Sequence, residues 1–188
     1  MTTNTVCTPP GGRCAEQEYR LSVYEAGHAL AARALKLRIL SVRILPRPPV
    51  LVSDKTFEGN NWESFIRTLE TRVIELFSGQ IAEELVCNAS NCCSGDVTRI
   101  DELTRLIAGL NDEDEVETVW FGLEEIAEEI FADPKFRAAI EPVAEFLYER
   151  FTNGEEEIDG RELDAELDKY VPPLPSRKKG LKRFLAFS

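Results

Sequence analysis

The sequence is poor in histidine, in methionine and in long apolar runs. Its 188 residues include one histidine, His28, and one methionine, Met1. No apolar run approaches the roughly 20 residues that span a bilayer. Residues 1–12 lack the basic segment and apolar core of a signal peptide. We therefore expect neither a transmembrane segment nor secretion, and we predict a cytoplasmic protein.

Positive charge and evenly paired cysteines are also lacking. Lysine and arginine number 22 against 34 acidic residues, and the net charge of −12 argues against general nucleic-acid binding. Five cysteines are an odd number, and without a secretion signal we expect them to be reduced thiols. Hydrophobic residues make up 43% of the chain, and its length fits one soluble globular domain with a sizeable core.

Composition divides the chain into three parts. Residues 1–14 are rich in Thr, Pro and Gly, and we predict a flexible lead-in. Residues 15–171 carry the periodic apolar pattern of a folded domain. Residues 172–188 form a proline-containing tail with five basic residues and no acidic residue. Such a tail is usually solvated, but it could also contact an acidic partner or a membrane surface.

Apolar residues at helical spacing predict a mainly α domain. Asn61 is placed to cap a long helix, and Asp133 with Pro134 opens another. Trp62 and Trp120 fall on apolar stripes and are expected in the core. The predicted helices cover approximately residues 16–37, 62–86, 96–110, 116–130, 134–151 and 159–170.

One short segment has the period of a β-strand. Leu40, Val42 and Ile44 alternate with polar residues, residues 46–49 interrupt the pattern with prolines, and residues 50–52 resume it. We predict a small β-hairpin or a bent edge strand between the first two long helices.

A degenerate metal-site motif lies within the first predicted helix. Residues 24–28 read Tyr-Glu-Ala-Gly-His. In the zinc-peptidase pattern H-E-x-x-H, two imidazoles one helical turn apart hold zinc, and the glutamate acts as general base on the zinc-bound water. Glu25 and His28 are in register with that pattern. Tyr24 stands at the first histidine position, and the chain has no second histidine to replace it.

Four segments, in order, resemble the peptidase domain of FtsH-type ATP-dependent zinc metalloproteases. They are Tyr24–Leu30, similar to HEAGHAL; Ser41–Pro46, similar to the strand that follows; Ser78–Leu85, similar to G-G-R-x-A-E-E-L with Gln80 in place of Arg; and residues 94–96, similar to S-x-D. Residues 154–167 are similar to the closing helix of that family. The resemblance covers about residues 16–170 and implies an FtsH-peptidase-like helical domain. We expect it to lack the ATPase module and the membrane anchor of that family.

The resemblance also implies roles for three residues. Glu25 would be the catalytic general base, and His28 and Asp96 would be zinc ligands, so that zinc is the implied cofactor. Tyr24 could ligate only as a phenolate, and because a free phenol has a pKa of about 10 we do not expect a direct replacement. Cys92 and Cys93 are alternative soft ligands or simply small loop residues.

Each of these residues has a purely structural interpretation as well. Glu25 would be a helix surface carboxylate, Asp96 a helix N-cap, and Tyr24 a packing residue that fills the space left by a metal. Under the resemblance we expect Glu25, His28 and Asp96 to meet in space, with or without metal.

Two functions of different classes follow. The first is a peptidase-like domain that has lost catalysis and serves as a binding or regulatory module for a protein or peptide. The second is a working zinc metalloendopeptidase with an unusual ligand set. A further hypothesis is a peptide-binding groove in which the edge strand near Val42 pairs with an extended chain.

Overall fold

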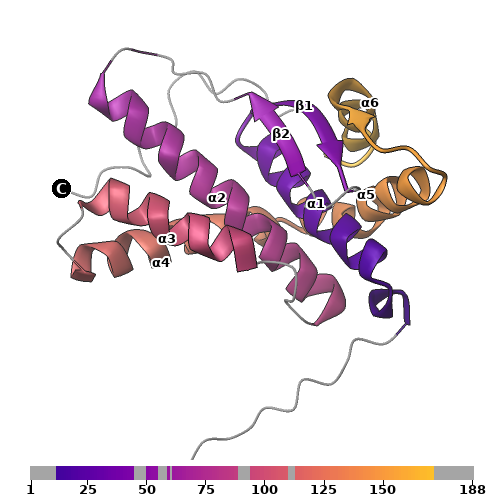
Figure 1. The fold of residues 1–188 in the computed structure, drawn as a ribbon, viewed down its shortest axis with the longest axis horizontal. Coiled ribbons are helices and arrows are strands. Elements are labelled where there is room, and N and C mark those ends of the chain that lie inside the picture. The colour runs from indigo at the N-terminus through magenta and orange to yellow at the C-terminus, as the bar shows by residue number, and fades with distance from the viewer. Residues whose placement is uncertain are drawn as a thin grey trace, which may run out of the picture.

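The computed structural model describes residues 12–44, 50–54, 59, 61–88, 94–109 and 113–171. Within these ranges the fold is mainly helical with one small sheet, as predicted (Figure 1). The helices are a short 3-10 helix, Gly12–Ala15, then α1 (Gln17–Ala34), α2 (Trp62–Cys87), α3 (Ser94–Ala108), α4 (Glu113–Ala132), α5 (Pro134–Thr152) and α6 (Gly160–Leu167). None of the helices in these ranges is long and apolar enough to cross a membrane.

Side-chain caps fix the starts of three helices. Asn61 accepts the backbone N–H of Ser64 at 2.8 Å at the start of α2. Asp133 and Asp159 each accept an N–H two residues on, also at 2.8 Å, at the starts of α5 and α6. Each cap satisfies a backbone donor that the helix leaves unpaired, and is worth about 1 kcal/mol. These local signals are why the predicted helix starts at Asn61 and Asp133 are confirmed.

The predicted hairpin belongs to a three-stranded antiparallel sheet in the order β2-β1-β3. β1 (Arg38–Arg43) pairs with β2 (Val50–Asp54) on one side and with β3 (Ile158–Asp159) on the other. The register shifts between Ile39 and Ser41, and this irregularity leaves Leu40 exposed rather than inward. The expectation that Val42 lies on an edge strand is wrong, because β3 returns from far along the chain to cover that side of β1. The prolines of residues 46–49 lie outside the described residues.

Two clusters of buried apolar side chains form the interior. The first core packs α1 against the sheet, α5 and α6, and includes Leu30 and Leu147. The second core lies among α2, α3 and α4, and includes Leu76 and Ile100. Ile81 of α2 contacts both. Figure 1 shows α3 and α4 on one side of α2, with α1, the sheet and α6 on the other.

Helices α1 and α2 approach closely at two glycines. A Cβ atom on Gly27 would lie 2.6 Å from the Cβ of Ala82. A Cβ atom on Gly79 would lie 2.6 Å from Cε1 of His28 and 2.9 Å from Cε1 of Tyr24. Carbon atoms pack best at about 3.5–4.0 Å, so neither position accepts a larger residue without movement. Because Gly27 and Gly79 have no side chain, residues 24–28 of α1 can lie directly against α2.

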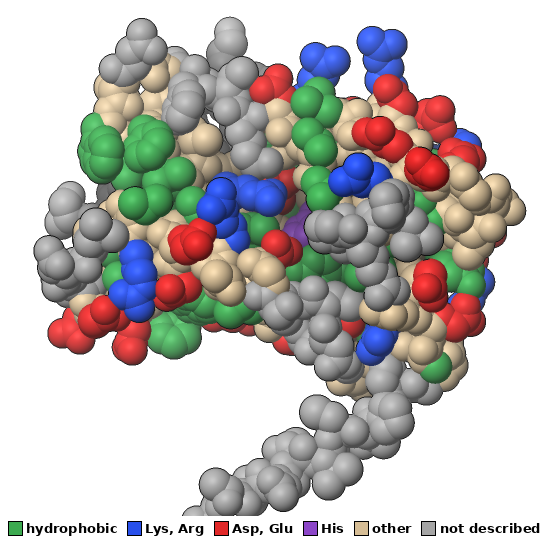
Figure 2. Space-filling view, viewed as in Figure 1, with side chains coloured by type: hydrophobic (Ala, Val, Ile, Leu, Met, Phe, Trp, Pro, Cys, Tyr) green, Lys and Arg blue, Asp and Glu red, His purple; other side chains and the backbone are tan. Residues whose placement is uncertain are grey.

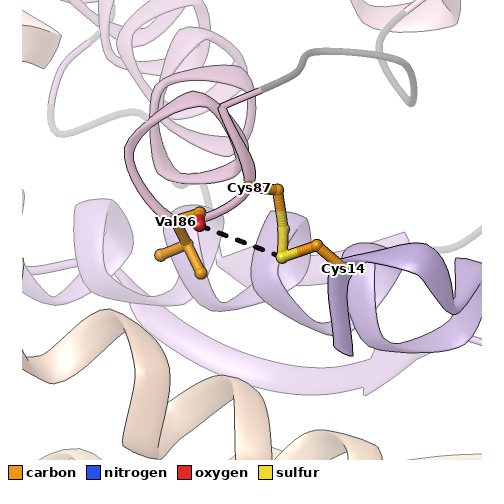
Figure 3. Close-up of a disulfide and its surroundings, with 3 residues drawn as sticks. All are labelled: Cys14, Val86 and Cys87. Atoms are coloured by element: carbon orange, nitrogen blue, oxygen red, sulfur yellow. Dashed lines mark hydrogen bonds between the residues drawn. A yellow bond between two sulfur atoms is a disulfide. The ribbon is translucent and has the colours of Figure 1, made fainter. Parts of the chain in front are cut away.

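The expectation of reduced thiols is wrong for two cysteines. Cys14 and Cys87 form a disulfide with a Cα–Cα distance of 5.5 Å across 73 residues (Figure 3). The bond fastens the segment before α1 to the last residue of α2. The dashed contact in Figure 3 joins the Cys14 sulfur to the Val86 carbonyl oxygen at 3.9 Å. An oxidised sulfur has no hydrogen to donate, so that contact is a hydrogen bond only in the reduced thiol.

Trp62 also departs from its predicted place in the core. It is 69% exposed at the first position of α2, where its ring packs on that of Phe65 at a centroid distance of 5.2 Å. Trp120 of α4 is half-buried and meets Phe77 of the second core at 5.3 Å. Apolar residues at the end of a helix are buried only if another element of the fold packs against that end.

Candidate functional site

The helix that carries the motif is buried on all sides. Every residue from Leu21 to Arg33 of α1 is buried. The helix packs against α2 and α5, with the sheet nearby. A polar side chain in such a position is costly unless it finds partners inside the protein. The polar residues of the motif therefore depend on what the neighbouring elements present to them.

Tyr24, His28 and Asp96 meet between α1 and α3. The Tyr24 hydroxyl donates a hydrogen bond to Oδ2 of Asp96 at 2.5 Å. Nε2 of His28 lies 3.5 Å from the same oxygen. The Tyr24 and His28 rings are edge-to-face with centroids 4.7 Å apart. The predicted meeting of His28 with Asp96 is thus confirmed, and Tyr24 takes part in it.

Both ring nitrogens of His28 face acceptors. Nδ1 lies 2.7 Å from the backbone carbonyl oxygen of Glu75, and Nε2 faces Asp96. Only the doubly protonated imidazolium can donate in both directions. Burial acts to lower the pKa of His28, but the carboxylates of Asp96 and Glu25 outweigh it, so the pKa is raised above its ordinary value. The site therefore favours a positive charge on His28.

Glu25 is a poorly satisfied polar group of the site. Its side chain is fully buried, and within the described residues its Oε2 atom has no hydrogen-bond partner. Burial raises the pKa of Glu25 to about 7, an effect that Asp96 adds to and His28 opposes. Its interpretation as a surface carboxylate is wrong. A carboxyl group that exchanges its proton near neutral pH has the property that a general base needs.

Asp96 lies in the first turn of α3, which begins two residues earlier, at Ser94. The interpretation of Asp96 as the N-cap is therefore wrong, and its carboxylate is directed to Tyr24 and His28 instead. Burial acts to raise the pKa of Asp96, but the contacts with His28 and Tyr24 outweigh it, and the pKa is lowered. An anionic Asp96 beside a cationic His28 is the favoured charge state.

Glu75 of α2 links the site to the sheet. Its buried carboxylate accepts hydrogen bonds from Oγ of Ser53 on β2 at 2.8 Å and from the Arg72 guanidinium at 2.9 Å. Its backbone carbonyl faces His28. Sequence reasoning missed Glu75, Arg72 and Ser53. The available signal was a carboxylate in the middle of the apolar run of residues 73–77.

The described residues fit a zinc ion only in part. Two ligands of a tetrahedral zinc with bonds near 2.0–2.1 Å lie about 3.4 Å apart, and the 3.5 Å between His28 and Asp96 agrees with that spacing. The Tyr24 hydroxyl, however, occupies the same Asp96 oxygen. In the described part of the chain, no three histidine, cysteine or acidic side chains are grouped so as to hold a metal. Cys92 and Cys93 lie outside that part.

The site reaches the surface at Asp96. The Asp96 side chain is 31% exposed, whereas that of His28 is 7% exposed. Figure 2 shows the side chain of the single histidine, in purple, as a small area near hydrophobic, acidic and basic side chains. The side-chain amide of Gln80 donates a hydrogen bond to Glu84 at 2.9 Å.

Comparisons with known proteins do not assign a family. The sequence matches no protein-family profile and no curated protein.

Proposed function

We propose that this chain is an FtsH-peptidase-like module that has lost proteolysis and binds a protein or peptide. The observation that carries the proposal is the hydrogen bond from Tyr24 to Oδ2 of Asp96. It satisfies, without metal, the carboxylate that the resemblance makes a zinc ligand. Glu25 and His28 keep their places beside it.

The loss of proteolysis follows from the number of ligands. A hydrolytic zinc needs about three protein ligands and a free position for water. His28 and Asp96 supply two, and Tyr24 supplies a protonated hydroxyl bound to one of them. Without a zinc-bound water, Glu25 has no activated nucleophile to deprotonate. Glu25 is then a relic of the general base.

The outer edge of β2 is the candidate surface for a peptide. Within the described sheet β2 pairs on one side only, with β1. Val52 of β2 is 41% exposed, and Ser53 connects the strand to Glu75. An extended peptide can add to such an edge as a further strand through main-chain hydrogen bonds. Because Glu75 also contacts His28, a peptide bound there would run close to the site.

A zinc endopeptidase with an unusual ligand set is the second candidate. Two features favour it: the spacing of His28 and Asp96, which suits two ligands of one zinc ion, and the burial that raises the pKa of Glu25 to about 7. Tyr24 would have to rotate away from Asp96 to admit the ion. The two candidates therefore differ in the state of Tyr24.

We propose a cytoplasmic location only if Cys14 and Cys87 are reduced thiols in the cell. A persistent disulfide is typical of oxidising compartments, and the structure joins Cys14 to Cys87. Alkylation of free thiols during denaturing lysis of cells, followed by peptide mass spectrometry, tests the point, because Cys14 and Cys87 are buried in the folded protein. All five cysteines alkylated would support a cytoplasmic location, and protection of Cys14 and Cys87 would contradict it.

The metal content of protein purified without chelator tests the proposed function. We expect wild-type protein to hold far less than one zinc per chain. Tyr24→His rebuilds H-E-x-x-H and should bind zinc at least about 100-fold more tightly, adding about 2.7 kcal/mol to the free energy of unfolding at 100 times Kd. Tyr24→Phe is the matched control, because it frees Asp96 without adding an imidazole. If folded Tyr24→His gains no zinc affinity, the peptidase-like interpretation of the site fails.

Fluorescein-labelled casein separates binding from cleavage. We expect wild-type protein to raise the anisotropy of the probe without cutting it. Val52→Lys should weaken binding, whereas Leu106→Lys, at a position 48% exposed on α3, should not. Zinc-dependent cleavage that Glu25→Gln abolishes would instead make the chain an enzyme.

A further inference from the structure

A concave surface lies outside the candidate site, where α2, α4 and α5 meet. This hollow encloses about 320 Å³. Apolar and charged side chains line it together: Ile81, Leu85 and Phe131 with Glu84, Glu128 and Arg137. Leu85 is 37% exposed, so part of the apolar lining is open to solvent. A ligand that fits must offer apolar groups together with charge.

The charge at the hollow is mainly negative. Burial raises the pKa of Glu124, and the nearby carboxylates of Glu128 and Glu84 raise it further. Among the described residues that line the hollow, Arg137 is the single cation. α4, which forms one wall, contains eight acidic residues and no basic residue along its 20 positions. The chemistry that suits this surface is a basic segment with apolar side chains.

We propose that the hollow binds the basic tail of this same chain, residues 176–188. The tail contains Arg177, Lys178, Lys179, Lys182 and Arg183 together with Leu181, Phe184, Leu185 and Phe187. The whole chain has a net charge of −12, of which the tail contributes +5, so the remainder carries −17. Tail and body therefore attract each other. In the proposed complex the lysines and arginines would pair with Glu84 and Glu128, and the aliphatic and aromatic side chains would pack on Ile81, Leu85 and Phe131.

The tail is long enough to reach the hollow. Val171, where the described chain ends, belongs to the same apolar core as Phe131, which lines the hollow. Seventeen residues follow Val171. An extended chain advances at most about 3.3–3.6 Å per residue, so the tail can span about 55 Å. α4 itself, at 20 residues, is only about 30 Å long.

Zero-length carbodiimide cross-linking of the full-length protein, followed by peptide mass spectrometry, tests the proposal. At low ionic strength we expect Lys178, Lys179 or Lys182 to couple to Glu84, Glu124 or Glu128 within one chain. The yield should not change on dilution, and it should fall several-fold in high salt because exposed charge pairs are screened.

Two matched double variants locate the contact. The double variant Glu84→Gln, Glu128→Gln should lower the total cross-linking yield of the tail lysines by about fivefold. The yield at Glu124, which this variant keeps, should fall as well. Glu156→Gln with Glu157→Gln removes the same charge from two exposed positions between α5 and β3 and should leave the yield unchanged. Both variants replace carboxylates by isosteric amides, so folding should be preserved.

Three outcomes would overturn the proposal. The first is coupling of the tail lysines chiefly to other carboxylates, or no coupling at all. The second is coupling only between chains, which would show a contact between two copies. The third is equal binding of wild type and the Glu84→Gln, Glu128→Gln variant to phosphatidylserine vesicles, because a docked tail must compete with the lipid.

Discussion

The helices around the two apolar cores of this protein differ in how firmly they are held. In the region of the first core, α1 is buried on all sides, crosses α2 at Gly27, and is fastened near its start by the Cys14–Cys87 bond. In the region of the second core, α3 and α4 leave Leu106 and Phe121 48% and 61% exposed, compared with 40% and 41% for Leu40 and Val52 of the sheet. Tyr24 and His28 come from the first region, and Asp96 comes from the second. The candidate site therefore connects, through polar side chains, the region of the first core, which a disulfide holds, with the more exposed region of the second core.

Opening the disulfide should have the largest effect on stability. In the chain-entropy estimate, a bond that closes a loop of 73 residues adds about 4 kcal/mol to the free energy of unfolding. We expect Cys14→Ser with Cys87→Ser to lose about that amount in urea unfolding. Wild-type protein in reductant should behave like the variant, and the variant itself should not respond to reductant. Equal stability of oxidised and reduced wild type would contradict the prediction.

Replacing Glu25 should change how stability depends on pH. The folded-state pKa of Glu25, about 7, lies above its ordinary value of 4.5. The folded protein therefore holds this proton more tightly than the unfolded chain, and the resulting stability is present below pH 4.5 and lost as the pH rises through 7. Glu25→Gln should be more stable than wild type at pH 8 by up to about 3 kcal/mol, relative to their difference at pH 4. Denaturant unfolding of both proteins across this range measures it, and a constant difference would contradict it.

The same substitution at two glycines should have opposite effects in the two regions. Gly27→Ala places a Cβ atom against Ala82 and the backbone of Ser78, and should destabilise the protein by about 2–3 kcal/mol. At Gly122 of α4 an added Cβ would meet nothing within 4 Å. Gly122→Ala should therefore stabilise by about 0.5–1 kcal/mol through helix propensity. Thermal unfolding of the two variants side by side checks the signs, and two losses of equal size would refute the contrast.

What the sequence could predict was set by local interactions. Two kinds of feature depend on residues only a few positions apart: the helix caps at Asn61 and Asp133, and the β1–β2 hairpin. The order of neighbouring residues is enough to predict them. The proximity of His28 and Asp96 came from the order of motifs in a resemblance, because periodicity does not specify which helices touch.

The remaining features depend on distant parts of the chain. Neither the Cys14–Cys87 bond nor the pairing of β1 with β3 leaves a local trace, since each joins segments that only the tertiary fold brings together. The role of Tyr24 was hidden for the same reason. Whether its hydroxyl reaches a carboxylate is decided by where α3 begins relative to α1.

Tyr24→Phe is the gentlest test of the connection between the two regions. The change removes the hydroxyl that donates to Asp96 and keeps the ring that packs on His28. Because the Asp96 side chain is 31% exposed, water can replace part of the lost bond, and we expect a loss of only about 1 kcal/mol. A double-mutant cycle with Asp96→Ala, which removes the acceptor, should give a coupling energy of similar size. Hydrogen exchange should quicken in α3 and stay unchanged in α5 and α6. If the two substitutions are additive, or if exchange rises equally throughout the protein, Tyr24 and Asp96 do not form the connection between the two cores.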